Sequence, residues 1–113
     1  MKLVLPLPEK ISTNTIYAGK HWRTRARHKE RYLADTVEWK NLTPITEYPV
    51  EITYIFRFKG RLLDTTNVAY MAKVVEDCLV AHGVLSNDSP QYVGATHLYS
   101  EKGARDEVEI YVV

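Results

Sequence analysis

Cysteine and long apolar runs are almost missing from this sequence of 113 residues, which has one cysteine. No stretch approaches the roughly 18 apolar residues of a membrane span. One cysteine excludes an internal disulfide, and Cys78 falls among the apolar residues of a predicted helix, so we expect a core residue rather than a nucleophile. The apolar run at the amino terminus is too short for a signal peptide. These absences predict a cytoplasmic protein with no membrane partner.

Motifs of several common enzyme classes are absent as well. The sequence has no G-x-S-x-G turn and no glycine-rich phosphate-binding loop. Its four histidines lack the close His/Cys spacing of a zinc site. The length, with 45% hydrophobic and 26% charged residues, is typical of one globular domain over residues 1–113 that can bury a core of its own.

The net charge of +1 hides a strong asymmetry along the chain. Residues 20–31, called the basic segment below, hold six lysines and arginines against one acid, whereas the rest of the chain has nine against thirteen. Such a segment can contact several phosphates, and an aromatic side chain within it can stack on bases or sugars. We expect a polyanion as partner, with a merely solvated basic helix as the alternative. The expected DNA contacts are Lys20, Trp22, Arg23, Arg25, Arg27, Lys29 and Arg31.

Hydrophobic periodicity predicts an α+β fold. Alternating apolar residues indicate strands, and apolar residues three and four apart indicate helices. The architecture should be a mixed sheet of four to five strands packed against two helices, with the last two strands forming a hairpin. In the first helix we expect Ala26, Leu33 and Val37 to face inward, with Tyr32 or Trp39 as further candidates. The expected strands cover 2–5, 13–17, 50–59, 92–100 and 107–113, and the expected helices cover 24–40 and 66–82.

The second predicted helix, with its flanks, concentrates the candidate chemistry. Tyr70, Lys73 and Asp77 fall on its polar side, Asp64 precedes it and Asp88 follows it. One interpretation is a site for a divalent metal and a phosphate. The other is an ordinary i,i+4 pair of Lys73 with Asp77, a helix cap at Asp64 and a turn at Asp88. Spacing alone leaves both open.

Several short motifs in this region resemble the RusA family of Holliday-junction resolvases, especially its phage and prophage members. They are D-x-x-N at 64–67, K-x-x-x-D-x-L at 73–79, Gly83 and N-D-S at 87–89. Upstream, Pro8, Asn14, Tyr17 and the basic stretch with Trp22 are similar to the amino-terminal half of that family, so the resemblance covers most of the chain.

The resemblance implies a homodimeric, Mg²⁺-dependent endonuclease of DNA recombination and repair, with Mn²⁺ as a possible substitute. Such an enzyme nicks two opposed strands of a four-way DNA junction. Matched position by position, Asp64, Lys73 and Asp88 would be catalytic, and Asp64, Asp77 and Asp88 would bind the metal. Mg²⁺ prefers hard oxygen ligands and keeps several waters, so a few carboxylates suffice. A lysine can stabilise charge on the scissile phosphate.

Three positions depart from the family's pattern. Thr66 stands where many members have a second aspartate, and Asn87 stands where an Asp-Asp pair is common. The spacing from Asn67 to Lys73 is three residues longer than in the most compact members. A site with one carboxylate fewer should bind metal more weakly. The alternatives are therefore a junction-binding or DNA-binding protein on the same fold that is catalytically weakened or inactive, and a small module that binds an acidic protein surface.

Chain geometry limits which aspartates can meet. A helix from Asn67 to His82 is about 22 Å long, whereas the chain from Gly83 to Asp88 spans at most about 17 Å. Asp88 can therefore reach the level of Lys73 if the chain folds straight back along the helix, but it does not easily reach Asp64. The open alternative is that a partner subunit supplies Asp88.

Overall fold

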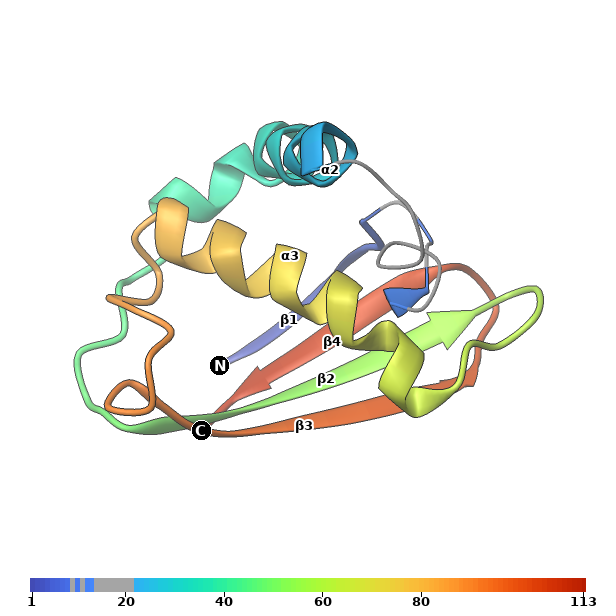
Figure 1. Cartoon of the computed structure of the whole chain (residues 1–113). Coiled ribbons are helices and arrows are strands. Elements are labelled where there is room, and N and C mark those ends of the chain that lie inside the picture. The colour runs from blue at the N-terminus through green and yellow to red at the C-terminus, as the bar shows by residue number, and fades with distance from the viewer. Residues whose placement is uncertain (9, 11, 14–21) are drawn as a thin grey trace.

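Four strands form one mixed sheet, and two α-helices lie on the same face of it (Figure 1). This computed structural model describes residues 1–8, 10, 12–13 and 22–113, with Trp22 described only in its backbone. The predicted α+β class is confirmed. The elements are β1 (Lys2–Pro6), α2 (Trp22–Asp35), η1 (Val37–Asn41), β2 (Val50–Phe58), η2 (Thr65–Val68), α3 (Ala69–Ala81), β3 (Val93–Lys102) and β4 (Glu107–Val112).

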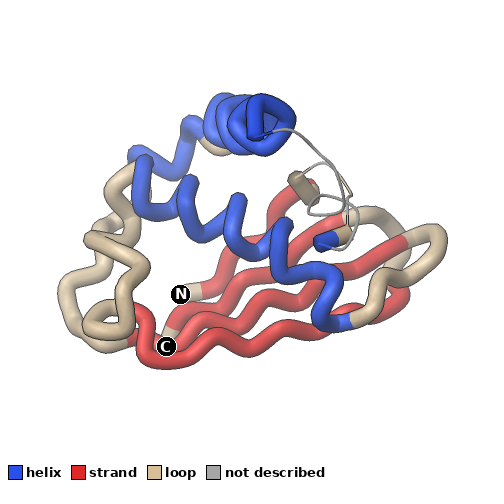
Figure 2. The backbone as a smooth tube through the Cα atoms, viewed as in Figure 1, coloured by secondary structure: helices blue, strands red, loops and turns tan. Residues whose placement is uncertain are grey.

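The strands lie side by side in the order β1-β4-β2-β3 (Figure 2). β4 is antiparallel to both β1 and β2, and β3 is parallel to β2, with α3 in the connection between them. The predicted hairpin of the last two strands is therefore wrong, because β2 lies between β3 and β4. β2 has ladder partners along both edges, which is the position expected for the strand with the most regular apolar face.

The connection from β3 to β4 passes around the end of β2. The N–H of Gly103 donates to the carbonyl of Phe58 at 3.1 Å, and the carboxylate of Asp106 accepts from the N–H of Lys59 at 2.9 Å. A Cβ atom at Gly103 would lie 2.7 Å from the Cβ of Arg57, closer than side chains tolerate. Glycine is required here because the connection presses against β2, and not because it forms a hairpin turn.

The core lies between the sheet and the helices. Ile52, Tyr54, Phe56 and Phe58 of β2 are fully buried on the face that the helices cover. Cys78 of α3 is fully buried as well, as predicted for a core residue. The predicted assignment of Tyr70 to the polar side of its helix is wrong, since its residue exposure is only 6%. α3 is covered by the sheet on one side and by α2 on another, so its buried surface is wider than one apolar stripe. Seven residues of α3 are buried: Tyr70, Met71, Ala72, Val74, Val75, Cys78 and Leu79.

The first predicted helix, 24–40, is divided into two parts. α2 ends at Asp35, and the hydroxyl of Thr36 donates to the carbonyl of Tyr32 at 2.8 Å just before η1 begins. The tighter winding of η1 changes which residues face inward. Tyr32 and Trp39 are buried, whereas Ala26 and Val37, which we expected to face inward, are exposed.

The other predicted elements lie within a few residues of the observed ones. The second helix starts with a 3₁₀ turn, η2, and continues as α3, and β3 extends to Lys102. The strand expected at 13–17 lies outside the described residues apart from its first residue. In the described ranges, no helix has both the length and the apolar character to cross a membrane.

Candidate functional site

Lys73 and Asp77 project from the middle of α3, one helical turn apart. The ammonium nitrogen of Lys73 lies 3.1 Å from Oδ1 of Asp77, which is the i,i+4 pair expected from the sequence. The side chains are 55% and 24% exposed, so Lys73 reaches into solvent while Asp77 is partly covered. Alone, this pair would be an ordinary surface ion pair of small energetic value.

The chain turns back along α3 directly after the helix ends. Gly83 takes the left-handed conformation, with φ of 82°, as expected for the residue after a helix. Val84 and Leu85 are both 1% exposed, and their N–H groups donate to the carbonyl of Leu79 at 2.9 and 3.2 Å. Burial of these two side chains fixes the direction in which the following loop leaves the helix.

Asn87 then shapes the loop around Asp88. Its side-chain oxygen accepts hydrogen bonds from the N–H groups of Asp88 at 2.7 Å and Ser89 at 3.1 Å. The carbonyl of Ser89 in turn accepts from the N–H of Val93 at 2.9 Å, where β3 begins. An asparagine side chain that satisfies nearby backbone N–H groups is a common way to hold a tight turn. Asn87, which we noted as a departure from the family, therefore supports the loop that carries Asp88.

This return brings Asp88 to Lys73. Oδ2 of Asp88 lies 2.6 Å from the ammonium of Lys73, so one lysine joins two aspartates from different elements. Chain length permitted this return without requiring it, and the structure shows the contact within a single chain. The hydrogen bond with Asp88, followed by the one with Asp77, raises the pKa of Lys73. The same hydrogen bond from Lys73 lowers the pKa of Asp88.

Asp64 is not part of this arrangement. It is exposed just before η2, its carboxylate makes no capping hydrogen bond, and its backbone carbonyl accepts from the N–H of Asn67. From Ala69 to Asp77 the helix rises about 12 Å, which separates Asp64 from the aspartate pair along the axis. Among the described residues, no three His, Cys, Asp or Glu side chains form a group that could hold a metal ion.

Asp77 and Asp88 nevertheless have the donor chemistry that Mg²⁺ requires. Both are carboxylates, and because they share one ammonium, their oxygens lie close to each other. Mg²⁺ is commonly held by one or two carboxylates together with waters and substrate phosphate oxygens. Partial exposure of the two side chains, 24% and 32%, leaves room for such waters. Asp77 and Asp88 therefore have the chemistry to hold a magnesium ion. Asp64 is not grouped with them, because it lies further along the helix axis.

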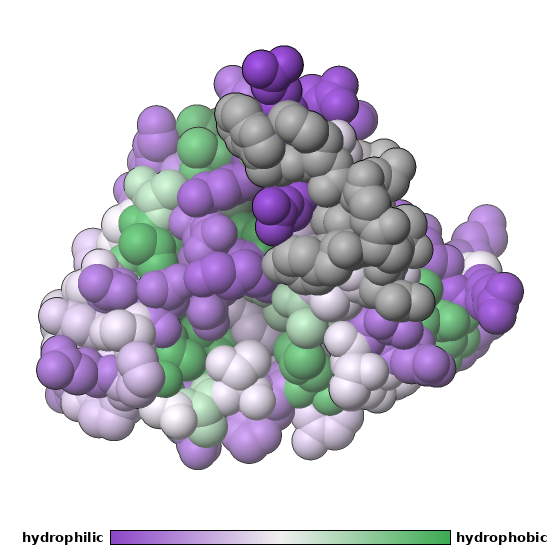
Figure 3. Space-filling view, in the orientation of Figure 1, coloured by the Kyte–Doolittle hydropathy of each residue, from purple (hydrophilic) through white to green (hydrophobic). Residues whose placement is uncertain are grey.

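A groove between α2 and α3 lies beside Lys73. It encloses about 270 Å³ and is bordered by Arg25 and Lys29 from α2 and by Tyr70, Lys73 and Asp77 from α3. The ammonium of Lys29 lies 3.7 Å from Oδ2 of Asp77. In the space-filling view, many hydrophilic side chains lie at the top and across the middle of the visible face, where Figure 1 places α2 and α3, with apolar ones among them (Figure 3). We call the cavity of about 270 Å³ between the two helices the α2–α3 groove. Its cations can receive a phosphate next to the aspartates.

No protein-family model matches the chain, and no curated protein matches it. What the site can do is therefore inferred from its geometry and from the motifs.

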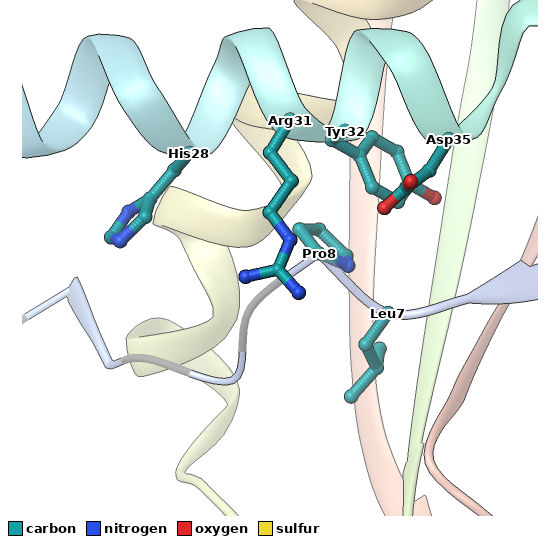
Figure 4. A pocket seen from close by; sticks show the side chains of 6 residues that line it. All are labelled: Leu7, Pro8, His28, Arg31, Tyr32 and Asp35. Atoms are coloured by element: carbon teal, nitrogen blue, oxygen red, sulfur yellow. The ribbon is translucent and has the colours of Figure 1, made fainter.

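The basic segment does not form a single surface. Arg25 and Lys29 border the α2–α3 groove, whereas Arg31 lines a separate cavity of about 160 Å³ between α2 and the end of β1. In Figure 4 the Arg31 side chain extends from α2 toward Pro8. Arg23 and Arg27 are exposed on α2. Lys20 and the side chain of Trp22 lie outside what the structure describes.

Two residues near Lys73 make contacts that the sequence did not predict. Glu76 accepts a hydrogen bond from the hydroxyl of Tyr54 at 3.2 Å, and burial raises the pKa of this glutamate. Tyr70 lies with its hydroxyl 2.8 Å from Nδ1 of His28 on α2. Helical periodicity predicted neither contact, since both depend on how β2 and α2 pack against α3.

Proposed function

We propose that the protein is a metal-dependent endonuclease that acts on branched DNA, with the four-way junction as its substrate, as the resemblance to RusA-type resolvases implies. The observation that carries this proposal is the return of Asp88 to Lys73 and Asp77 at the α2–α3 groove. Phosphodiester hydrolysis uses residues of these types, namely carboxylates, a lysine and further basic side chains beside them.

In this mechanism, Asp77 and Asp88 would hold Mg²⁺, which supplies positive charge at the phosphate and a water of lowered pKa when bound. Arg25 and Lys29 hold neighbouring phosphates in the groove and so orient the strand. Lys73 acts as a donor of a charged hydrogen bond to a phosphate oxygen. Lysine is ordinarily protonated near neutral pH, so its ammonium can act as this donor. We also assign Asp64 a catalytic role, because the resemblance to RusA-type resolvases implies one.

The direct test is incubation of the purified protein with a synthetic four-way junction and Mg²⁺ or Mn²⁺. We expect paired, symmetric nicks with the wild type and none on linear duplex of the same sequence. Asp64→Asn, Lys73→Ala and Asp88→Asn should each lower the nicking rate by roughly a hundredfold, as the loss of one charged group at a phosphate does. Junction binding in a gel-shift assay should persist.

Two exposed residues away from the site, Lys40 and Glu47, provide matched controls. Lys40→Ala and Glu47→Gln remove charges of the same sign as the site variants and should leave the nicking rate unchanged. Equal loss of activity in these controls would contradict the assignment of Lys73 and Asp88.

A second candidate function is a DNA-binding protein on the same fold that does not cleave. It is favoured by the position of Asp64, which joins no group with Asp77 and Asp88, and by Thr66, which offers no charge. Binding of junctions without nicks in either metal would support it. Equal affinity for junction DNA, duplex DNA and an unrelated polyanion such as heparin would contradict both candidates.

A further inference from the structure

The ammonium of Lys73 occupies the space between the two carboxylates that would hold a cation. It lies 2.6 Å from Oδ2 of Asp88 and 3.1 Å from Oδ1 of Asp77, which are ordinary distances for charged hydrogen bonds. A divalent cation would need oxygens of these same two side chains. The lysine and the cation therefore compete for one pair of ligands.

The charges around this pair are already balanced without a metal ion. Lys73 contacts both aspartates, and Lys29 approaches Asp77 from the opposite helix at 3.7 Å. Two carboxylates thus face two ammonium groups, which leaves little net negative charge to attract a cation. The Lys73 side chain is 55% exposed, so its ammonium can move away into solvent or the α2–α3 groove without loss of core packing.

We propose that Lys73 is an internal competitor for the cation, so that its ammonium sets a low metal affinity of the protein without DNA. This inference rests on the proposed function, because it takes Asp77 and Asp88 as the metal ligands. It gives Lys73 two effects of opposite sign. The lysine supports cleavage when it contacts the scissile phosphate, and it opposes metal binding when it contacts the aspartates.

The test is the affinity of the DNA-free protein for Mn²⁺, measured by the electron paramagnetic resonance signal of unbound Mn²⁺. Lys73→Gln keeps most of the side-chain length but removes the charge. We expect it to bind Mn²⁺ roughly tenfold more tightly than the wild type, since a unit charge a few ångströms from the ion is removed at a largely solvated site. Adding Asp88→Asn to Lys73→Gln should abolish the gain.

Lys40→Gln is the matched control, because it removes the same charge from an exposed lysine on η1. Its Mn²⁺ affinity should equal that of the wild type within twofold. Circular dichroism melting of each variant checks that the fold is kept. Equal affinity of Lys73→Gln and wild type, or an equal gain in Lys40→Gln, would overturn the inference.

Failure of this inference and failure of the proposed function have different signatures. The proposed function fails when the wild type leaves junctions intact in both metals. The inference fails when the wild type cleaves junctions but Lys73→Gln gains no affinity for Mn²⁺. A variant that loses cleavage and at the same time gains metal affinity supports both, and a merely structural role of Lys73 would not raise the affinity.

Discussion

At the scale of single residues, Glu109 shows how a charged side chain is held in this fold away from the candidate site. It lies on the sheet face away from the helices, because its neighbours Val108 and Ile110 on β4 point into the core, and it is only 5% exposed. Its carboxylate accepts from the hydroxyl of Tyr111 and pairs with Lys2 at 3.0 Å and Arg57 at 2.5 Å. The Tyr111 hydrogen bond, followed by those from Lys2 and Arg57, lowers the pKa of Glu109 to about 2.

This shift predicts a specific dependence of stability on pH. A carboxyl group whose pKa is lower in the folded than in the unfolded state stabilises the fold above the unfolded value, and the contribution is lost as pH falls toward the folded value. For Glu109 the window runs from its ordinary pKa of 4.5 down to about 2. Between pH 6 and pH 3, the free energy of unfolding in urea should fall more steeply in wild type than in Glu109→Gln. Glu47→Gln, at an exposed loop position, should keep the wild-type slope.

Some residues of the candidate site follow from short-range rules, and others do not. The Lys73–Asp77 pair and the left-handed Gly83 could be predicted because each depends only on spacing along one helix. The return of Asp88 could be predicted as far as chain length allowed. Burial of Tyr70 could not, because it depends on α2, whose position over α3 is not encoded in the periodicity of α3. The sequence predicted one apolar stripe on α3, whereas both the sheet and α2 cover this helix.

At the scale of elements, the strands could be predicted from alternation, but their partners could not. Apolar residues at every second position of β4 show that one face of the strand is buried. This pattern does not identify the strands that pair with β4, because it would be the same beside any neighbour in the sheet. The short connection of 103–106 suggested a hairpin, although it leads around β2 instead. In α2, by contrast, helical geometry alone separates the basic residues. At about 100° per residue, Arg25 and Lys29 fall on one side, and Arg23, Arg27 and Arg31 cluster on another.

That separation predicts unequal roles for two pairs of cations on α2. Arg25→Gln/Lys29→Gln should weaken junction binding and reduce the slope of log affinity against log salt by roughly 1.8, since each lost phosphate contact accounts for about 0.9. Arg23→Gln/Arg27→Gln removes the same charge from exposed positions outside the groove and should change the slope less. Fluorescence anisotropy with a labelled junction over a range of salt concentrations measures both. An unchanged slope in the first variant would refute a phosphate contact at the groove.

At the scale of the whole molecule, the arrangement of the aspartates bears on the homodimer that the resemblance to RusA-type resolvases implies. One chain is sufficient to bring Lys73, Asp77 and Asp88 together. The sequence left open whether Asp88 acts in its own chain, and for the contact with Lys73 a single chain suffices. Asp64 is the third aspartate of the proposed site. It lies before η2, away from Asp77 and Asp88 along the helix axis. In a dimer with two-fold symmetry, the Asp64 of one subunit can complete the site of the other.

Mixing inactive subunits tests this exchange. Asp64→Asn and Asp88→Asn chains are unfolded together, refolded together at equal concentration and assayed on a four-way junction. If Asp64 acts across the dimer, each mixed dimer has one intact site and one that lacks both aspartates. Random pairing then restores roughly a quarter of the wild-type sites. Such a dimer nicks one strand rather than two opposed strands, so single nicks should dominate over paired nicks.

The control mixture pairs Lys73→Ala with Asp88→Asn chains. These two side chains meet within one subunit, so no mixed dimer has an intact site, and nicking should stay absent whichever subunit supplies Asp64. If the Asp64→Asn and Asp88→Asn mixture is equally inactive, while unmixed wild type treated in the same way recovers full nicking, Asp64 does not act across the dimer. Asp64 then acts within its own chain, at a position apart from Asp77 and Asp88.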